Sequence, residues 1–273
     1  YLLESYPHLV KPIEFVYPLY ESGFKFRIGM ILYQLLGKQK ALPKYKFLNK
    51  QKTLENCDFI DTENLKGSFS YFDGITHDAR LTAEIIFGAT QYPNTRALNY
   101  VELMQGEQKQ EHYELTCQDR IRNQKLDIKT KFVANCSGAW TDLVLNKFSK
   151  LESNKMAPSK GVHLVFSQDK IPIKTAYAFS SYADDGRKFY ALPWQNNSVI
   201  IGVTDTEYAG DLDKIPVDKL DIDYMLHAIV HFFPNLNITK EDVIYQYVGL
   251  RPLFDEKTAS KDKTRDYKII GCN

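Results

Sequence analysis

The chain has 273 residues, of which 44% are hydrophobic, and a formal net charge of +1 at pH 7. A chain of this length buries a sizeable core and forms one large or two moderate domains. The near-zero charge excludes the overall basic footprint of a nucleic-acid-binding protein. The four cysteines are scattered without a CxxC pair, which argues against a metal site or a disulfide framework and favours a reducing compartment.

The N-terminal sequence carries no signal peptide, and no run of 18 apolar residues occurs, so no membrane span is predicted. The chain opens at Tyr1 rather than Met, and we expect a fragment of a longer protein. The 18 Tyr and 16 Phe favour β-structure and a pocket with aromatic walls.

The first elements are broken by prolines and glycines. Residues 1–20 contain three prolines and are expected to form an irregular connection. Residues 24–36 predict an apolar helix with a basic tail, which either lies on a membrane surface or packs on its own domain. Residues 49–54 open a short helix, and residues 66–72 form a strand that turns at residues 73–74.

The central part predicts strand, turn and helix units. Asp78 caps a helix that runs to about Ala89. Gly106 and Asn123 are expected to mark turns between the strands that follow. Those strands are predicted near residues 96–104, 112–119 and 125–131.

A turn of small residues comes next. Residues 132–134 predict a buried strand, and a helix begins near Trp140. Between them, Ser137 and Gly138 let a ligand approach the backbone, and the new helix offers N–H groups to a phosphate. A plain strand-to-helix turn explains the same residues, so both readings stay open.

Residues 158–166 predict a strand that carries a histidine. Alternation places Lys160 with Val162 on one face and Gly161 with His163 on the other. A strand histidine is either a hydrogen-bonded structural residue or a catalyst, and both remain open. The later elements are predicted strands at residues 177–181, 188–193 and 198–204 and helices at residues 218–232 and 239–242.

Residues 245–254 predict a strand that stops at Gly249, after which Pro252 holds Arg251 extended. A guanidinium fixed there holds a phosphate or carboxylate with two hydrogen bonds. Arg265 is a second arginine, and the two are expected to converge on one anionic substrate. The alternative, that Arg251 pairs with a core carboxylate and Arg265 faces solvent, stays open.

The elements together predict an antiparallel sheet with helices, plus strand–turn–helix units of a different character near residues 75–150. This pattern indicates an α/β plus α+β protein whose two domains are interleaved in sequence.

Several short motifs occur in the order and at the spacing of one known family. Through them the chain resembles FAD-dependent glycerol-3-phosphate dehydrogenases. The motifs are YFDG at 71–74, DARL at 78–81, LNYVE at 98–102, NCSGAW at 135–140, PSKGVH at 158–163, IGVTDT at 201–206, VGLRPL at 248–253 and TRDY at 264–267.

This resemblance implies a partial FAD domain of the glutathione-reductase type, interleaved with an antiparallel-sheet substrate-binding cap. It implies a cap at residues 1–74 and 151–247 and a partial flavin domain at residues 75–150 and 248–273. FAD is the implied cofactor.

The resemblance also implies roles for single residues. Arg251 and Arg265 match the family's substrate-site arginines, and His163 matches a histidine near the flavin and the substrate's C2 hydroxyl. His163 and Arg251 are therefore the implied catalytic residues. Val101 matches the position whose backbone faces the adenine.

In the same comparison Ser137 and Gly138 fall in the turn that approaches the FAD ribose and pyrophosphate, while Thr204 and Asp205 are expected to be structural. The sequence departs from the family in having no G-x-G-x-x-G motif, which cradles the pyrophosphate. The family's N-terminal arginine segment and C-terminal Gly-Gly-Lys segment are missing as well. We therefore expect this chain alone to bind FAD weakly or not at all.

The implied reaction oxidises sn-glycerol 3-phosphate to dihydroxyacetone phosphate, with His163 as the base. A quinone is favoured as final acceptor over dioxygen. The alternatives are a related FAD-dependent amine or amino-acid oxidase and a non-catalytic phosphate-binding domain. A cytoplasmic location, peripheral to the inner or mitochondrial membrane, is expected; membrane-surface association and a homodimer stay open.

Overall fold

The computed structural model describes residues 2–21, 23, 28–29, 31, 42–148, 155–181, 186–255, 266 and 268–271. The predicted helix over residues 24–36 lies almost wholly outside these residues, and Arg265 lies outside them. The chain divides into two compact units. Unit 1 is Tyr1–Ile85, Val162–Thr204 and Pro216–Val248, and unit 2 is Ile86–Gly161, Asp205–Ile215 and Gly249–Asn273.

These units divide the chain at other residues than the predicted cap and flavin domains do. Residues 75–85 belong to unit 1, and residues 155–161 and 205–215 belong to unit 2. The assignment of a cap and a flavin domain stays a prediction.

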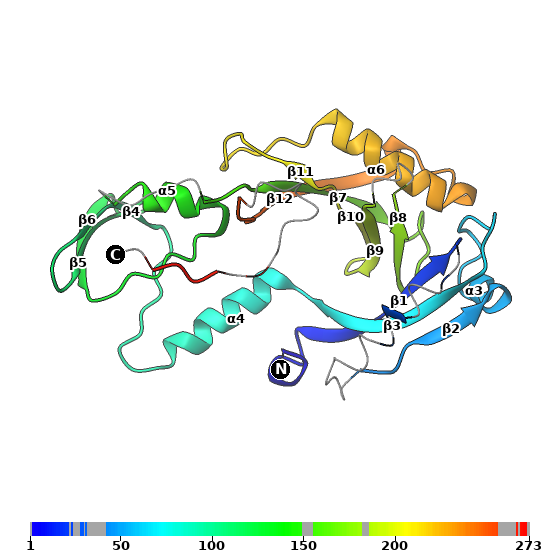
Figure 1. The fold of residues 1–273 in the computed structure, drawn as a ribbon, viewed down its shortest axis with the longest axis horizontal. Coiled ribbons are helices and arrows are strands. Elements are labelled where there is room, and N and C mark those ends of the chain that lie inside the picture. Colours follow the sequence, from blue (N-terminus) through cyan, green and yellow to red (C-terminus); the bar gives the residue numbers. More distant parts are fainter. Residues whose placement is uncertain are drawn as a thin grey trace. The chain divides into compact units, whose positions relative to one another are not determined.

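The larger sheet has nine strands in the order β11-β7-β10-β9-β8-β1-β3-β2, with β12 also paired to β7. The pairing of β1 with β8 is parallel, and the other neighbours whose register is known are antiparallel. The strands are β1 (Val10–Leu19), β2 (Lys46–Asn49), β3 (Gly67–Thr76), β7 (Ser159–Ser167), β8 (Ala176–Ser180), β9 (Lys188–Trp194), β10 (Ser198–Gly202), β11 (Thr206–Glu207) and β12 (Val243–Arg251) (Figure 1).

The prediction of an irregular segment over residues 1–20 is wrong, because β1 is a ten-residue strand. It pairs with β3 along its whole length but with β8 only at Phe15 and Val16. The carbonyl of Glu14 accepts a bond from Thr175 Oγ1 on the β8 side. Pro12 and Pro18 lie two and four residues from Glu14, so their backbone is directed to the same side of β1 as that of Glu14. Most of this side has no strand partner, so the N–H group that a proline lacks is not needed there.

The predicted turn at residues 73–74 is also wrong, because both residues lie inside β3. Gly74 pairs with Pro12 of β1 and Asp73 pairs with Ile13. The helix predicted from Asn49 is confirmed, since the Asn49 side chain accepts a hydrogen bond from Lys52 N at 2.9 Å. The helices of this part are α1 (Leu2–Ser5), α3 (Lys50–Asn56) and α4 (Asp78–Thr90).

One helix, α6 (Lys219–Phe232), covers a face of the strands β7 to β10 (Figure 1). The helix predicted over residues 218–232 is confirmed, and a capping box between Asp218 and Asp221 starts it. Its apolar face carries Met225 and Phe232, and the Phe232 ring stacks on Phe179 of β8 with centroids 4.1 Å apart. Burial of this stripe forms the main core of unit 1.

Unit 2 contains a separate antiparallel sheet, β4 (Val101–Gln108), β5 (Tyr113–Asp119) and β6 (Gln124–Thr130). The turn at Asn123 is confirmed, with φ at 55°. The turn predicted at Gly106 is wrong, because Gly106 lies inside β4. A Cβ there would stand 2.2 Å from the Phe148 ring, so this glycine admits an aromatic side chain against the strand.

Residues 132–134 do not form the predicted buried strand. They run without regular structure, and Phe132 is 85% exposed. Burial of such a run needs neighbouring strands, and the described part of the chain provides none beside it. The helix expected near Trp140 is confirmed as the short pair η1 (Gly138–Trp140) and α5 (Thr141–Leu145).

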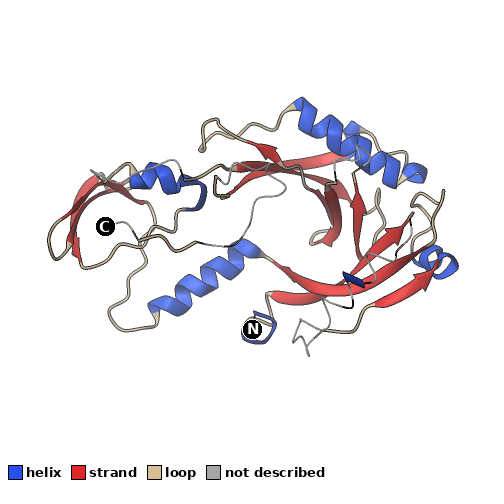
Figure 2. Ribbon diagram, in the orientation of Figure 1, coloured by secondary structure: helices blue, strands red, loops and turns tan. Residues whose placement is uncertain are grey.

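The predicted fold class is confirmed by this mixed α/β architecture, with a large mixed sheet and a separate three-stranded antiparallel sheet (Figure 2). The remaining short helices are η2 (Pro234–Leu236) and η3 (Lys240–Asp242). Among the described residues, no helix has the length and apolar character needed to cross a membrane.

Candidate functional site

Arg251 ends β12, which runs through Gly249 rather than stopping there. Its Nη1 donates to Ser159 Oγ at 3.2 Å and forms an ion pair with Asp205 Oδ1 at 3.4 Å. Ser159 Oγ in turn donates to Asp205 Oδ1 at 2.5 Å. The side chains of Arg251 and Asp205 are only 20% and 11% exposed, so the guanidinium is held in one place.

Local pairing brings these three residues together within unit 2. Glu207 of β11 lies opposite Ser159 of β7, which places Asp205 beside the start of β7. After Pro252, Leu253 accepts a backbone hydrogen bond from Ala157 N at 2.8 Å. The carboxylate partner that the sequence left as an alternative for Arg251 is therefore present, and it is Asp205.

The turn at Ser137 and Gly138 is closed by side chains. Asn135 Oδ1 accepts from Ser137 N at 3.2 Å and from Ser137 Oγ at 2.6 Å, and Asn135 Nδ2 donates to Thr141 O at 3.1 Å. Gly138 has φ at +60°, where a side chain would be strained. The sequence reading missed Asn135 as the residue that shapes this turn, although an Asx residue before a Ser-Gly pair is a turn signal.

This turn lies next to the residue that follows Arg251. A Cβ built on Gly138 would be 3.9 Å from Pro252 Cβ, and both residues belong to unit 2. Two segments singled out from the sequence, the small-residue turn and the Arg-Pro end of β12, are thus neighbours.

The turn at Ser137 and Gly138 is the one expected to approach a flavin dinucleotide. Gly138 bears no side chain, and Ser137 is engaged with Asn135, so backbone is what the turn offers a ligand. The five-residue α5 is too short for the helix-dipole phosphate site that the sequence suggested. Val101 is a half-buried residue at the start of β4, opposite Asp119.

His163 lies in a narrow slot on the sheet of unit 1. Its imidazole stacks on the Tyr247 ring of β12, with centroids 4.6 Å apart and planes 6° apart. On the other neighbouring strand, Gly202 of β10 pairs with His163, and a Cβ there would be 2.2 Å from His163 Cδ2. The ring is therefore fixed by an aromatic face and by the absence of a side chain at position 202.

Tyr247 and Gly202 were not predicted as site residues. Their roles come from the pairing of β10 and β12 with β7, which spans 39 and 84 positions of sequence and leaves no local signal. Burial, together with the negative charge of Asp78, raises the pKa of Tyr247 above its usual value. Tyr247 is thus a neutral phenol beside the imidazole.

Thr204 has the structural role expected for it, since its Oγ1 accepts a hydrogen bond from Val162 N at 2.9 Å. His163 belongs to unit 1 and Arg251 to unit 2, and Arg265 lies outside the described residues. The convergence of the three on one substrate therefore stays a prediction. The described residues contain no group of three His, Cys, Asp or Glu side chains placed to hold a metal.

Comparison with solved structures places this architecture among flavin-dependent oxidoreductases. The glycerol-3-phosphate dehydrogenase from Bacillus halodurans complexed with FAD matches 94% of this chain with a TM-score of 0.79 and 31% identity, and the match covers 47% of that chain. The model of the family described as "DAO: FAD dependent oxidoreductase" matches residues 7–268, and the chain belongs to this family.

Curated relatives carry two kinds of name. The alpha-glycerophosphate oxidase of Streptococcus pneumoniae is 34% identical over 265 residues, which cover 93% of this chain and 43% of that protein. The glycerol-3-phosphate dehydrogenase of Synechocystis sp. is 30% identical over 272 residues, covering 92% of this chain and 48% of that protein. The chain thus spans less than half the length of these relatives, and the predicted resemblance and the FAD cofactor are confirmed at the level of the family.

Proposed function

We propose that the protein containing this chain oxidises sn-glycerol 3-phosphate to dihydroxyacetone phosphate. The observation that carries the proposal is the 31% identity and the TM-score of 0.79, over 94% of the chain, to a glycerol-3-phosphate dehydrogenase. Fold alone does not specify a substrate, so the proposal depends on the named residues as well. When bound, FAD accepts the hydride that leaves C2 of the substrate.

His163 is the proposed base. An imidazole nitrogen takes the proton of the C2 hydroxyl, and the stacked Tyr247 ring and the bare backbone at Gly202 keep the imidazole in one orientation. A histidine suits this task because its ordinary pKa lies near neutrality.

Arg251 and Arg265 are the proposed anchors for the substrate's phosphate and for the developing alkoxide. The link from Arg251 to Asp205 and Ser159 supports this role, because it fixes one Nη atom and orients the planar guanidinium. Side chains alternate along a strand, so Ser159 and His163, which are four residues apart on β7, point to the same face of that strand.

We propose Val101, Ser137 and Gly138 as contacts of the adenine, ribose and pyrophosphate of FAD. The support is the φ of +60° at Gly138 and the side-chain bonds that leave backbone facing outward at this turn. The isolated chain is proposed to bind FAD weakly or not at all, because its sequence contains no G-x-G-x-x-G motif.

We propose a quinone as the final electron acceptor. Dioxygen is the second candidate, and the similarity to the S. pneumoniae protein named an oxidase favours it. Hydrogen peroxide formation during turnover identifies dioxygen, whereas reduction of a quinone analogue without peroxide identifies a quinone.

The test of the substrate uses the full-length protein reconstituted with FAD. Bleaching of the flavin absorbance on anaerobic addition of glycerol 3-phosphate, and not of glycine or proline, is the expected result. No bleaching by glycerol 3-phosphate would rule the proposal out.

The test of the residues uses His163→Asn and Arg251→Lys. We expect His163→Asn to lower kcat about 10²–10⁴-fold, the usual contribution of a general base. Arg251→Lys is expected to raise KM and lower kcat together, because lysine lacks the planar two-pronged donor. Arg122→Lys, at a side chain that is 76% exposed, is the matched control and should leave both constants unchanged.

A further inference from the structure

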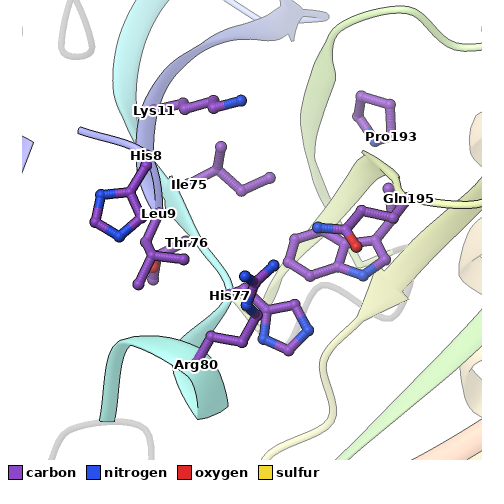
Figure 3. A pocket seen from close by; sticks show the side chains of 10 residues that line it. His8, Leu9, Lys11, Ile75, Thr76, His77, Arg80, Pro193 and Gln195 are labelled. Atoms are coloured by element: carbon purple, nitrogen blue, oxygen red, sulfur yellow. The ribbon is translucent and has the colours of Figure 1, made fainter. Parts of the chain in front are cut away.

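Unit 1 contains an open pocket of about 330 Å³ that includes none of the residues assigned above. It lies between β1, the junction of β3 with α4, and the end of β9 (Figure 3). The residues that line it with polar or aromatic groups are His8, Lys11, Thr76, His77, Arg80, Trp194 and Gln195.

The pocket is rich in cationic groups. Lys11 comes from β1 and Arg80 from the first turn of α4, and neither forms an ion pair with any residue that the structure describes. No aspartate or glutamate lines the pocket. The nearby Asp78 carboxylate accepts from Ala79 N at 2.8 Å, and Glu84 lies 2.8 Å from His8 Nε2.

The accessible donors of the pocket are those of Lys11 and Arg80, because both side chains are exposed. Thr76 and His77 also line the pocket, but Thr76 Oγ1 and His77 Nδ1 are shielded from solvent. An ammonium and a guanidinium both donate to an oxyanion.

The aromatic and apolar side chains of the pocket suit the body of a small organic molecule. The indole of Trp194 lies 6.2 Å from the His77 ring, centroid to centroid, with the planes 35° apart. Ile75 and Pro193 also line the pocket with apolar groups. Figure 3 shows Arg80, His77 and Gln195 gathered on one side of the pocket and Lys11 on another.

We propose that this pocket binds the phosphate group of a small phosphorylated molecule with an aromatic or apolar body. Donors from three separate elements suit the three free oxygens of a phosphate ester better than the two oxygens of a planar carboxylate. Neither of the proposed substrate residues, His163 and Arg251, lines this pocket. The alternative is that Lys11 and Arg80 face water and bind no ligand, and the titration below distinguishes the two.

Trp194 provides the readout. The chain has two tryptophans, and Trp140→Phe leaves Trp194 as the only one within residues 1–273. The emission that a further Trp194→Phe substitution removes is assigned to Trp194. Phenyl phosphate titrated into this variant of the full-length protein is expected to change Trp194 emission along a saturating curve. Inorganic phosphate is expected to compete, and phenol is expected to have no effect.

Removal of the two cations tests the assignment. Lys11→Gln and Arg80→Gln, each in the Trp140→Phe background, are expected to weaken phenyl phosphate about tenfold, the loss of one charge-assisted hydrogen bond. Arg80→Lys is expected to restore part of the affinity. Lys174→Gln, at another exposed lysine of unit 1, is the matched control and should change nothing.

Arg251→Ala separates this site from the proposed substrate site, since it is expected to impair glycerol 3-phosphate oxidation and leave the Trp194 titration unchanged. The pocket proposal fails if the emission change is absent, if it does not saturate, or if the Lys11 and Arg80 variants bind as tightly as the parent. It also fails if Arg251→Ala abolishes the titration. The Tm of each variant is measured, and only variants whose Tm equals that of the parent protein are compared.

Discussion

The two units of the molecule differ in the interactions that stabilise each of them internally. Every member of the large apolar core, from Val16 to Ile238, lies in unit 1. The buried apolar side chains described in unit 2 are Cys117, Ala139, Leu145, Phe148 and Leu253. Around Arg251, unit 2 depends instead on hydrogen bonds, such as those of Ser159 and Asp205.

This difference predicts two kinds of sensitivity. The imidazole of His163 is placed by shape, so it responds to added volume. The guanidinium of Arg251 is placed by a charge pair, so it responds to the loss of its partner. Substitutions that add a methyl group to unit 1 and remove a carboxylate from unit 2 test the contrast directly.

The largest effect is expected from Gly202→Ala in unit 1. The new methyl group would stand 2.2 Å from His163 Cδ2, so the imidazole must move. A displacement of about 1 Å at a reacting group costs about 10²-fold in rate. With His163 as the proposed base, we expect a fall of this size in kcat/KM for the proposed substrate glycerol 3-phosphate. NMR resonances of the His163 ring should shift as well.

Gly249→Ala is the control for that change, because no atom lies within 4 Å of a Cβ at Gly249. Its kinetics and its histidine resonances should match the parent protein. Equal effects of the two substitutions would mean that the slot around His163 has no special role.

The next effect is expected from Asp205→Ala in unit 2. Removal of the carboxylate breaks the ion pair with Arg251 in a site where the Asp205 side chain is 11% exposed. Breaking such a buried pair costs about 3 kcal/mol, measured as a loss of unfolding free energy in urea. Glu102→Ala breaks the exposed pair with Arg120 in the same unit and should cost less than about 1 kcal/mol. Similar costs for the two would contradict the role given to the polar network.

The smallest effect concerns pH. Burial raises the pKa of the Cys57 thiol in unit 1 from an ordinary value of 9.0 to about 11. Below pH 9 the thiol is protonated in both the folded and the unfolded state, so its full contribution to the free energy of unfolding is present. Between pH 9 and 11 the unfolded chain releases the proton first, so the folded state loses about 2–3 kcal/mol of stability as pH rises.

Cys57→Val is therefore expected to flatten the fall in stability between pH 9 and 11. Burial and the negative charge of Asp127 also raise the pKa of Cys117, which lies in the small sheet of unit 2. Cys117→Val is the matched control and should retain most of the fall, because the deeper core surrounds Cys57. A steeper profile in Cys57→Val than in Cys117→Val would contradict the assignment.

Regular alternation made part of the fold predictable. The strands near residues 113–119, 124–130 and 159–167 were placed within one or two residues, because one face of each is more buried than the other. Residues 132–134 have the same apolar character but lie exposed, because burial depends on neighbours that a local pattern does not contain.

Glycine and proline misled the prediction at β1, Gly74 and Gly106. These residues often break a strand, yet here the prolines face a mostly unpaired edge and Gly106 admits the Phe148 ring. Both explanations require knowledge of the partner strand or side chain. A single sequence contains no such information.

The sequence singled out His163 and Arg251 as candidate site residues, but it did not predict which side chains surround them. Asp205 lies 46 residues from Arg251, and Tyr247 lies 84 residues from His163, so neither contact has a local signal. The pocket at Lys11 and Arg80 joins three elements and was not anticipated either. Motif resemblance locates a residue, whereas its orientation depends on sheet pairing.

The short contact between β1 and β8 makes a seam in the large sheet. Only Phe15 and Val16 pair across it, and Pro12 and Pro18 carry no amide hydrogen to add to it. Strands β1, β2 and β3 can therefore separate from β8 with the loss of few backbone bonds. Amide hydrogen exchange at Val16 should proceed by this local opening, and it should be faster than at Ile201, whose strand is paired on both sides. The large sheet should therefore open at this seam into two parts, each of which keeps its own strand pairing.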